Sequence, residues 1–342
     1  MLKLKFVTAR NPRLAPLLDG TVKPDNIELE IVLSPPGELF YHNLLYDDFD
    51  VSEMSMSECL IVREKNQAGR WQWSGLPVFL SKAFLWFNLM VNTGSGIERG
   101  EDFKGKRVAV PDFPMTAALW MRIMFKELYN IRPQDIQWHV GRRKTKSHGG
   151  IVGLDRESLP GISLEWLTDN QTMDVMLDRG ELDAAFGIVP RDDPSPFEKI
   201  DSYGGTRIEG NPRLRKFFTD GGRGITTEYY RKAGFLPANH TIVVQKKILE
   251  EHPWVALELY KTFQRSKEVA YERARSMLGT YLLFEAEDYR KQAEYFGADP
   301  YPLGIKQNLK MLETLFRNSY EEGLTKKQAR IEDVFYKTTL ET

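Results

Sequence analysis

Proton transfer near neutral pH is typical histidine chemistry, and His240 is the best placed of the five histidines in the chain. It opens a β-branched segment, residues 240–245, that is typical of a buried strand. Glu53 lies beside another short predicted strand, where its carboxylate could shift the pKa of a neighbouring histidine. We therefore predict that His240 and Glu53 form an acid–base pair. The alternatives are a hydrogen-bonded structural histidine and a solvent-facing glutamate.

Ser55 and Ser57 share the neighbourhood of Glu53, because alternation places these three side chains on one side and the intervening methionines on the other. Both are candidate ligand contacts, although a serine here could equally cap a helix. His148 lies in a polar, glycine-containing loop, residues 142–150, that could close over a ligand. The acid–base pair could also hold a divalent metal, but no HxH or HExxH spacing supports this, so we expect no required metal or other cofactor.

A carboxylate ligand needs hydrogen-bond donors, and the segment VAVPDFPMTAALWMR at residues 108–122 could supply them from its backbone. Its pattern predicts a strand, a loop stiffened by two prolines and a helix that starts near Thr116. Unpaired N–H groups at a helix start carry a partial positive charge and bind anions. The candidate ligand contacts of this loop, with Phe113 as a stacking surface, are Asp112, Phe113, Met115 and Thr116. The alternative is a well-capped helix without a ligand.

Cationic side chains are the other partners that a carboxylate can use. Arg10 directly follows the first predicted strand, Lys82 lies in a predicted crossover segment and Arg191 lies in a proline-rich loop. We predict that all three contact the ligand. The basic run at residues 142–146 is typical of a solvated loop, with an anion clamp as the second interpretation.

These candidates follow the ends of predicted strands, which brings them together if the strands form open sheets. The N-terminal part of the chain alternates strand and helix, and a long apolar stretch is expected to cross as extended strands to a second α/β unit. The sequence thus predicts two α/β lobes with a ligand cleft between them. Residues 1–88 plus 245–342 would form lobe 1, and residues 89–244 would form lobe 2. Extra C-terminal helices are expected to pack back on lobe 1.

Composition excludes several classes of protein. The chain of 342 residues is long enough for two domains, and its net charge of -1 lacks the positive balance expected of a nucleic-acid-binding protein. Cys59 is the one cysteine, which excludes an intramolecular disulfide and a cysteine-based zinc site. No apolar run is long enough for a membrane span, and the N-terminus lacks the apolar core of a signal peptide. We therefore expect a cytoplasmic protein without a membrane partner.

Five segments carry a resemblance to known proteins: MLKLKFVTARNPRLAPLLDGTVKPDNIELEIV, DVSEMSMSE, LMVNTGSGI, GKRVAVPDFPMTAALWMR and NHTIVVQKKILEEHPWVALELYKTF. Together they resemble the 4,5-dihydroxyphthalate decarboxylase family over nearly the whole chain. The resemblance implies a fold like that of type II periplasmic binding proteins and a cytoplasmic homo-oligomer. It also implies an enzyme that removes CO2 from a small hydroxylated aromatic acid without oxidation, as in the conversion of 4,5-dihydroxyphthalate to protocatechuate.

That reaction sets requirements on the site. Decarboxylation leaves an electron pair on a ring carbon, so the site needs a proton donor, a group that polarises a ring hydroxyl and cations for any remaining carboxylate.

One departure from the family favours a second hypothesis. The Arg-His pair of the family's crossover strand is Leu85-Trp86 here, which favours a non-catalytic solute-binding-like protein that holds an aromatic carboxylate.

Overall fold

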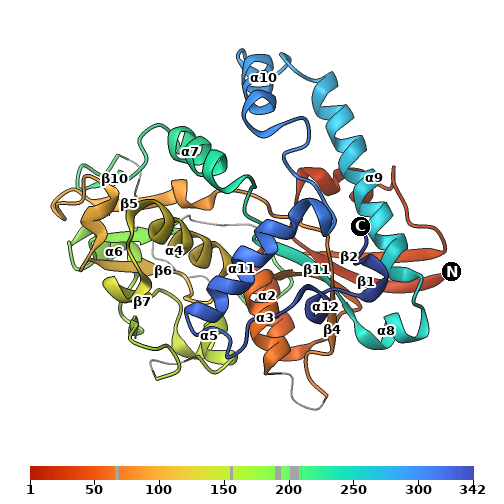
Figure 1. Ribbon diagram of the computed structural model, residues 1–342, viewed down its shortest axis with the longest axis horizontal. Helices are drawn as coiled ribbons and strands as arrows, with labels where there is room; N and C mark the ends of the chain where they lie inside the picture. The colour runs from red at the N-terminus through yellow and green to blue at the C-terminus, as the bar shows by residue number, and fades with distance from the viewer. Residues whose placement is uncertain (66–68, 155–156, 189–193, 201–207, 209) are drawn as a thin grey trace.

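The computed structural model describes residues 1–65, 69–154, 157–188, 194–200, 208 and 210–342. Within these residues the chain forms two mixed β-sheets that lie in separate lobes, each flanked by helices (Figure 1). The first sheet has the strand order β2-β1-β3-β11-β4, and the second has the order β10-β5-β9-β6-β7-β8. The predicted two-lobed α/β architecture is therefore confirmed.

The first sheet carries Glu53 into the interior. Its strands are β1 (Leu2–Thr8), β2 (Ile27–Leu33), β3 (Val51–Ser55), β4 (Trp73–Leu76) and β11 (His240–Gln245). β1 runs parallel to β2 and β3, whereas β11 lies antiparallel between β3 and β4. Every residue of the central strand β3 is buried, so its polar side chains must find hydrogen-bond partners inside the protein.

Helices cover this sheet through their apolar faces. In chain order they are α1 (Ala15–Leu18), α2 (Pro36–Tyr46), α3 (Met56–Glu64), α8 (Lys246–Glu251) and α9 (Val255–Ser276). The ring of Phe263 in α9 packs on Phe6 of β1 at a centroid distance of 5.5 Å. β3 runs straight into α3, so Ser55 is both the last residue of the strand and the N-cap of the helix. This leaves the first N–H groups of α3 at the end of the sheet.

The second lobe surrounds a deeply buried helix. Its strands are β5 (Leu89–Asn92), β6 (Arg107–Val110), β7 (Gln137–Val140), β8 (Ser163–Trp166), β9 (Ala184–Phe186) and β10 (Leu214–Lys216). Its helices are α4 (Thr116–Tyr129), α5 (His148–Ile151), α6 (Met173–Asp178) and α7 (Arg223–Ala233). Residues 116–125 of α4 are all buried, as expected for a helix that is apolar on every side.

Two antiparallel segments connect the lobes. The N–H of Ala83 donates to the carbonyl of Pro237 at 3.0 Å, and the N–H of Asn239 donates to the carbonyl of Ser81 at 2.7 Å. The outgoing segment is not extended throughout as predicted, because a 3-10 helix at Leu85–Asn88 interrupts it. The returning segment enters the first sheet at His240, earlier than the predicted boundary at residue 245.

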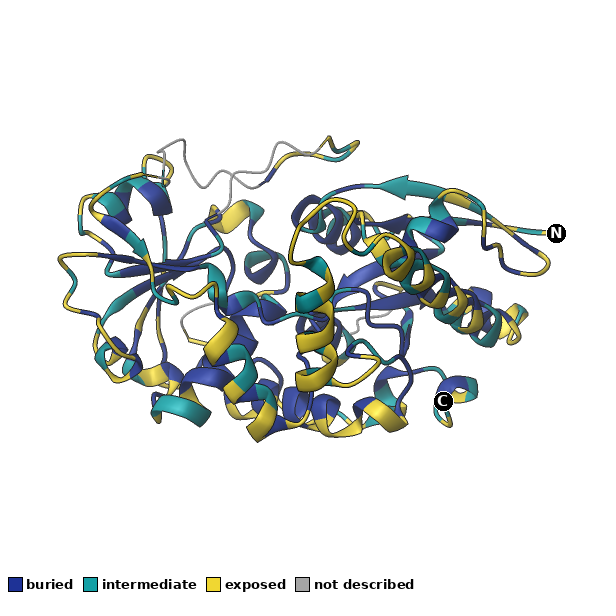
Figure 2. Cartoon of the chain, turned by 90° about the horizontal axis from the view of Figure 1, so that it is seen from above, coloured by how far each residue is buried: buried dark blue, intermediate teal, exposed yellow. Residues whose placement is uncertain are grey.

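The C-terminal helices do not pack on lobe 1 alone, which corrects the prediction. They are α10 (Glu285–Phe296), α11 (Leu309–Glu321) and α12 (Ile331–Val334). α11 contacts α3 of the first lobe and α4 of the second, so it spans both. α10 projects from the body together with the end of α9 (Figure 1), and it has no buried residue, so its ribbon carries no dark blue in the burial colouring of Figure 2.

Candidate active site

A cavity of about 200 Å³ lies between the lobes beside the crossover segment. Both lobes contribute to its wall, as the predicted cleft requires. Its lining residues are Pro36, Gly37, Phe40, Ser55, Glu58, Ser81, Leu85, Asn88, Pro111, Met115, Thr116, Ala117, Arg142, His148, Phe186, Gly187 and His240.

A histidine–carboxylate pair lies on one wall of the cavity. Nδ1 of His240 and Oε1 of Glu53 are 2.7 Å apart, which is possible because the two residues are diagonal neighbours across β3 and β11. The other oxygen of Glu53 accepts hydrogen bonds from the hydroxyl of Thr8 at 2.8 Å and the N–H of Ala9 at 2.9 Å. Glu53 thus holds one ring nitrogen of His240, and the imidazole itself borders the cavity.

The carboxyl of Glu53 is arranged to stay ionised. Burial raises its pKa, but the hydrogen bond and charge of His240 and the donors from Ala9 and Thr8 outweigh burial, so its pKa lies below the ordinary value. An ionised Glu53 requires that Nδ1 of His240 carry a hydrogen, because a carboxylate can only accept. The carboxylate therefore fixes the orientation of the ring and leaves Nε2 as the nitrogen that it does not hold.

A second histidine–carboxylate pair connects the lobes. Nδ1 of His148 in α5 lies 2.8 Å from Oε1 of Glu58 in α3, and Nε2 of His148 donates to the carbonyl of Gly37 at 3.0 Å. His148 and Glu58 are both buried, and both border the cavity. Oε2 of Glu58 has no hydrogen-bond partner among the described residues. This buried oxygen can therefore accept a hydrogen bond from a ligand hydroxyl.

Asp112 holds the loop that carries His148. Its carboxylate accepts from the N–H groups of His148 at 2.6 Å and Gly149 at 3.1 Å, and from Nη1 of Arg142 at 3.4 Å. Burial raises the pKa of Asp112, although the charges of Arg142 and His148 act in the opposite direction. Arg142 also lines the cavity, so Asp112 positions a cation there without lining the cavity itself.

A hydroxyl cluster joins the starts of α3 and α4. The hydroxyl of Thr116 lies 2.8 Å from that of Ser55 and 3.0 Å from that of Ser57, and it accepts from the N–H of Ser57 at 3.0 Å. No side chain caps α4 at its N-cap, Met115, and the helix start borders the cavity at residues 115–117. The first-turn N–H groups of α4 and Arg142 together form an attractive site for an anion.

Five of the predicted site residues line this cavity: His240, Ser55, Met115, Thr116 and His148. Three more lie directly behind it and bond to the lining residues: Glu53, Ser57 and Asp112. The structure thus brings together most of the predicted set, although the role of each residue stays a prediction.

Three of the other predicted contacts, Arg10, Phe113 and Lys82, do not line this cavity. The side chain of Arg10 is exposed outside the cavity. Phe113 is fully buried, between the guanidinium of Arg122 at 3.9 Å and the ring of Trp138 at 5.8 Å, so its ring packs in the core and does not line the cavity. Lys82 borders a different cavity, because its side chain leaves the other side of the crossover segment. Arg191 lies outside the described residues.

Sequence reasoning missed two charged residues of the cavity wall. Arg142 is the first residue of the basic run that was interpreted as a solvated loop, and its position directly after a strand was the available signal. Glu58 lies three residues after Ser55, within a helix whose first seven residues are all buried. Charged side chains are rarely buried without a partner, so the charge of Glu58 in this buried segment was a signal of a functional residue.

In the described part of the chain, His, Cys, Asp and Glu side chains form no group of three or more that could hold a metal ion. Both oxygens of Glu53 contact protein groups, Thr8 and Ala9 on one side and His240 on the other. None of the described helices combines the length and apolar character that a membrane crossing needs.

Sequence comparison finds related decarboxylases, although no family model matches the chain. The chain is 30% identical over 344 residues to a 4,5-dihydroxyphthalate decarboxylase of Comamonas testosteroni, with 100% of this chain and 98% of the relative covered. It is 29% identical over 235 residues to a 4,5-dihydroxyphthalate decarboxylase of Pseudomonas putida, with 68% of this chain and 83% of the relative covered.

Structure comparison finds solute-binding proteins. The alkanesulfonate-binding protein SsuA of Xanthomonas axonopodis pv. citri, bound to MOPS, superposes with a TM-score of 0.52 at 13% identity, and 98% of each chain is covered. At this identity the likeness concerns the fold alone. It confirms the predicted binding-protein-like fold.

Proposed function

Since the chain belongs to the 4,5-dihydroxyphthalate decarboxylase family, we propose that it removes CO2 from a hydroxylated aromatic acid without oxidation. The observation that carries the proposal is the pair of buried histidine–carboxylate contacts at one cavity, His240 with Glu53 and His148 with Glu58. A cavity that only held an anion would need cations and N–H donors, but it would have no need of a histidine oriented by a buried carboxylate.

Each part of the substrate has a partner in the proposed site. The carboxylate binds Arg142 and the N–H groups at the start of α4, and a ring hydroxyl donates to the unpartnered oxygen of Glu58. The ring lies toward the apolar wall provided by Phe40 and Leu85. A buried cavity strengthens these charge-assisted hydrogen bonds relative to water.

The chemical step is an exchange of a proton for CO2. Nε2 of His240 gives a proton to the ring carbon that bears the carboxylate, while Glu53 accepts the hydrogen bond of Nδ1 and orients the ring. The hydroxyl at Glu58 supplies electron density to that carbon. The carbon–carboxylate bond then breaks, its electron pair restores the aromatic ring and CO2 leaves. His240 regains a proton from solvent, so the scheme requires neither an oxidant nor a cofactor.

A second candidate function is a non-catalytic protein that holds an aromatic carboxylate. The solute-binding likeness of the fold and the apolar Leu85 in the cavity wall, at the position of the family's arginine, favour it. Both functions use the same anion site, so binding alone cannot separate them.

The test is incubation with hydroxybenzoates and hydroxyphthalates in D2O. A decarboxylase releases CO2 and leaves one deuterium on the carbon that lost it, which mass spectrometry of the product detects. The His240→Gln variant should bind the same acid, as measured by calorimetry, and should release CO2 far more slowly. A protein that binds an acid of the panel tightly and returns all of them unchanged would be the binding protein instead.

A further inference from the structure

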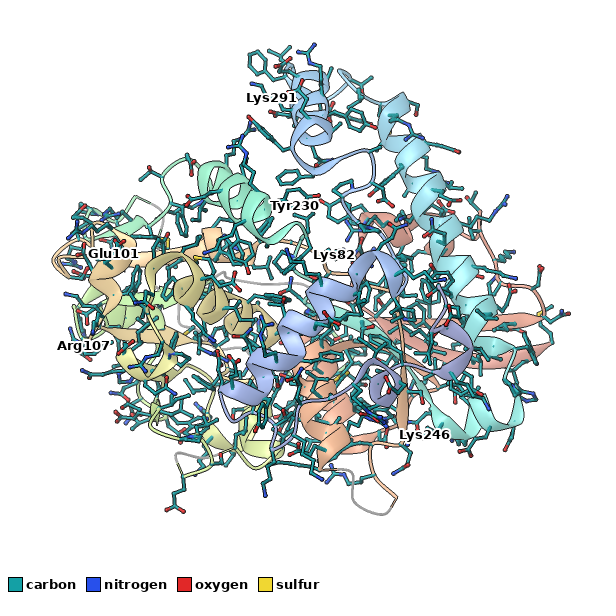
Figure 3. All side chains as sticks on the ribbon, viewed as in Figure 1. Lys82, Glu101, Arg107, Tyr230, Lys246 and Lys291 are labelled. Atoms are coloured by element: carbon teal, nitrogen blue, oxygen red, sulfur yellow. The ribbon has the colours of Figure 1, made fainter. Side chains whose placement is uncertain are left out.

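A second cavity lies behind the crossover segment and belongs to no part of the proposed reaction. It measures about 360 Å³. Ser81, Leu85 and Asn88 face the first cavity, whereas Lys82, Phe84 and Phe87 face the second. One short segment therefore forms a wall of both cavities. Figure 3 shows Lys82 near the centre of the molecule, with Lys291 above it on α10.

Lys82 is a buried amine whose protonated form has unused hydrogen-bonding capacity. Its residue is 3% exposed, and Nζ donates to Oδ1 of Asn308 at 2.6 Å. An ammonium has three donors, and the other two find no acceptor among the described residues. No described carboxylate lies within ion-pairing distance of this ammonium. A buried charge that is not neutralised by a partner is costly, so the site favours an incoming anion.

The charges around Lys82 are largely committed to other partners. Asp299 attracts Lys82, but its Oδ2 already accepts from Nζ of Lys267 at 2.5 Å. Arg13 repels Lys82 and stacks over the ring of Tyr301 at 4.1 Å. At the mouth of the cavity, Arg223 bonds to Asp288 at 2.9 Å and Lys291 lies 3.5 Å from Glu287. Burial, more than these charges, lowers the pKa of Lys82 to about 7.

The rest of the wall suits a flat apolar group. Its aromatic side chains are Phe84, Phe87, Tyr295, Phe296 and Tyr301. They come from the crossover segment, from α10 and from the stretch that follows α10. The start of α7 at residues 222–227 closes the side toward the second lobe. A cavity with one buried cation among aromatic rings matches a ring that carries a single acidic group.

We propose that this cavity is a second small-molecule site, which binds an aromatic carboxylate through Nζ of Lys82 with its ring among the aromatic side chains. Because the walls come from both lobes and from the crossover segment, the bound acid contacts the parts of the chain that set the relative position of the lobes. The proposal is independent of decarboxylation, since it also holds for a protein that only binds its ligands.

The test is calorimetric titration of the full chain with 2-naphthoate. The wild type should bind two molecules per chain, Lys82→Met should bind one and the control Lys246→Met should bind two. Lys82→Met should weaken the second site by about ten-fold or more, as for a lost charge-assisted hydrogen bond. One site in the wild type, or two in Lys82→Met at unchanged affinity, would overturn the proposal.

A pH series gives a second readout that does not depend on a variant. An anion binds the protonated amine, so the affinity of this site should fall about ten-fold between pH 6 and pH 8, as the amine with its pKa of about 7 loses its proton. Binding there should also take up protons, which titrations in buffers of different ionisation enthalpy measure. If Lys82→Met fails to fold, Tyr295→Ala at the exposed mouth replaces it and should weaken the same site. A flat pH profile for both sites contradicts the proposal.

Discussion

The two histidine–carboxylate pairs of the first cavity each join one histidine to one glutamate, but their hydrogen bonds allow the two histidines different functions. His240 and Glu53 lie in one sheet, and the carboxylate holds only Nδ1 of the imidazole. His148 has both ring nitrogens engaged, by Glu58 of the other lobe and by the carbonyl of Gly37. A histidine with a ring nitrogen toward the cavity can transfer a proton, whereas one bonded at both nitrogens positions the lobes.

The largest expected effect tests the first pair. His240→Gln should lower kcat by about 10²–10⁴-fold, because it removes a general acid, and should change substrate affinity little. Single-turnover kinetics on an acid that the wild type decarboxylates measures both quantities. His252→Gln, at the end of α8 outside the cavity, is the matched control and should keep wild-type turnover. If His240→Gln retains wild-type kcat, the proton comes from another group.

The second pair should show the opposite kinetic signature. His148→Phe removes the hydrogen bond between His148 and Glu58, which links the two lobes, and leaves the buried carboxylate of Glu58 without that partner. This loss should destabilise the protein by about 1–3 kcal/mol. We expect a raised KM and a smaller change in kcat, because the variant affects positioning. Thermal unfolding and steady-state kinetics measure the two effects. If only kcat falls, His148 transfers a proton, and the two pairs then do not differ in function.

The hydroxyl cluster that joins the two lobes should contribute less. Thr116→Val keeps the shape of the side chain but removes the hydroxyl that contacts Ser55 and Ser57. We expect a loss of about 1 kcal/mol in the free energy of unfolding, as for a buried hydrogen bond. Denaturant unfolding measures it, with Thr227→Val at a half-buried position of α7, away from this cluster, as the control.

The pH dependence of stability should report on Glu53. Its pKa is lowered in the folded protein, so its ionised form stabilises the fold above the unfolded pKa of about 4.3, and this contribution is lost as pH falls through the folded value. The wild type should therefore lose stability more steeply than Glu53→Gln as pH decreases from about 5 toward 3. Identical slopes in urea unfolding at these pH values would mean that folding does not lower the pKa of Glu53.

The smallest effect is expected at Arg10. The sequence predicted that it binds the ligand carboxylate, but its side chain is exposed outside the cavity. Arg10→Ala should leave affinity unchanged and alter stability by less than about 0.5 kcal/mol. Arg142→Met, in the cavity wall, is the contrasting variant and should weaken binding by about ten-fold or more. If Arg10→Ala weakens ligand binding as much as Arg142→Met does, Arg10 contacts the ligand.

The sequence by itself was enough to predict helices and strands that the structure contains and part of the acid–base pair. Alternation in strands and the position of Ser55 at a strand-to-helix change follow from local steric preferences, which nearby residues fix. Glu53 was recognisable next to the end of a short predicted strand, and His240 was recognisable as the first residue of another, which is β11 in the structure. The start of α4 was recognisable because a predicted strand and a loop precede it.

Tertiary structure alone decided which side chains share a cavity. Glu58 and His148 are 90 residues apart and meet only because the lobes pack against each other. Lys82 and Leu85 lie in one short segment, yet they face different cavities. Phe113 follows a strand end as the site residues do, yet Arg122 and Trp138 draw it into the core. Local sequence sets the conformation of a segment, but the direction of its side chains depends on packing against distant residues.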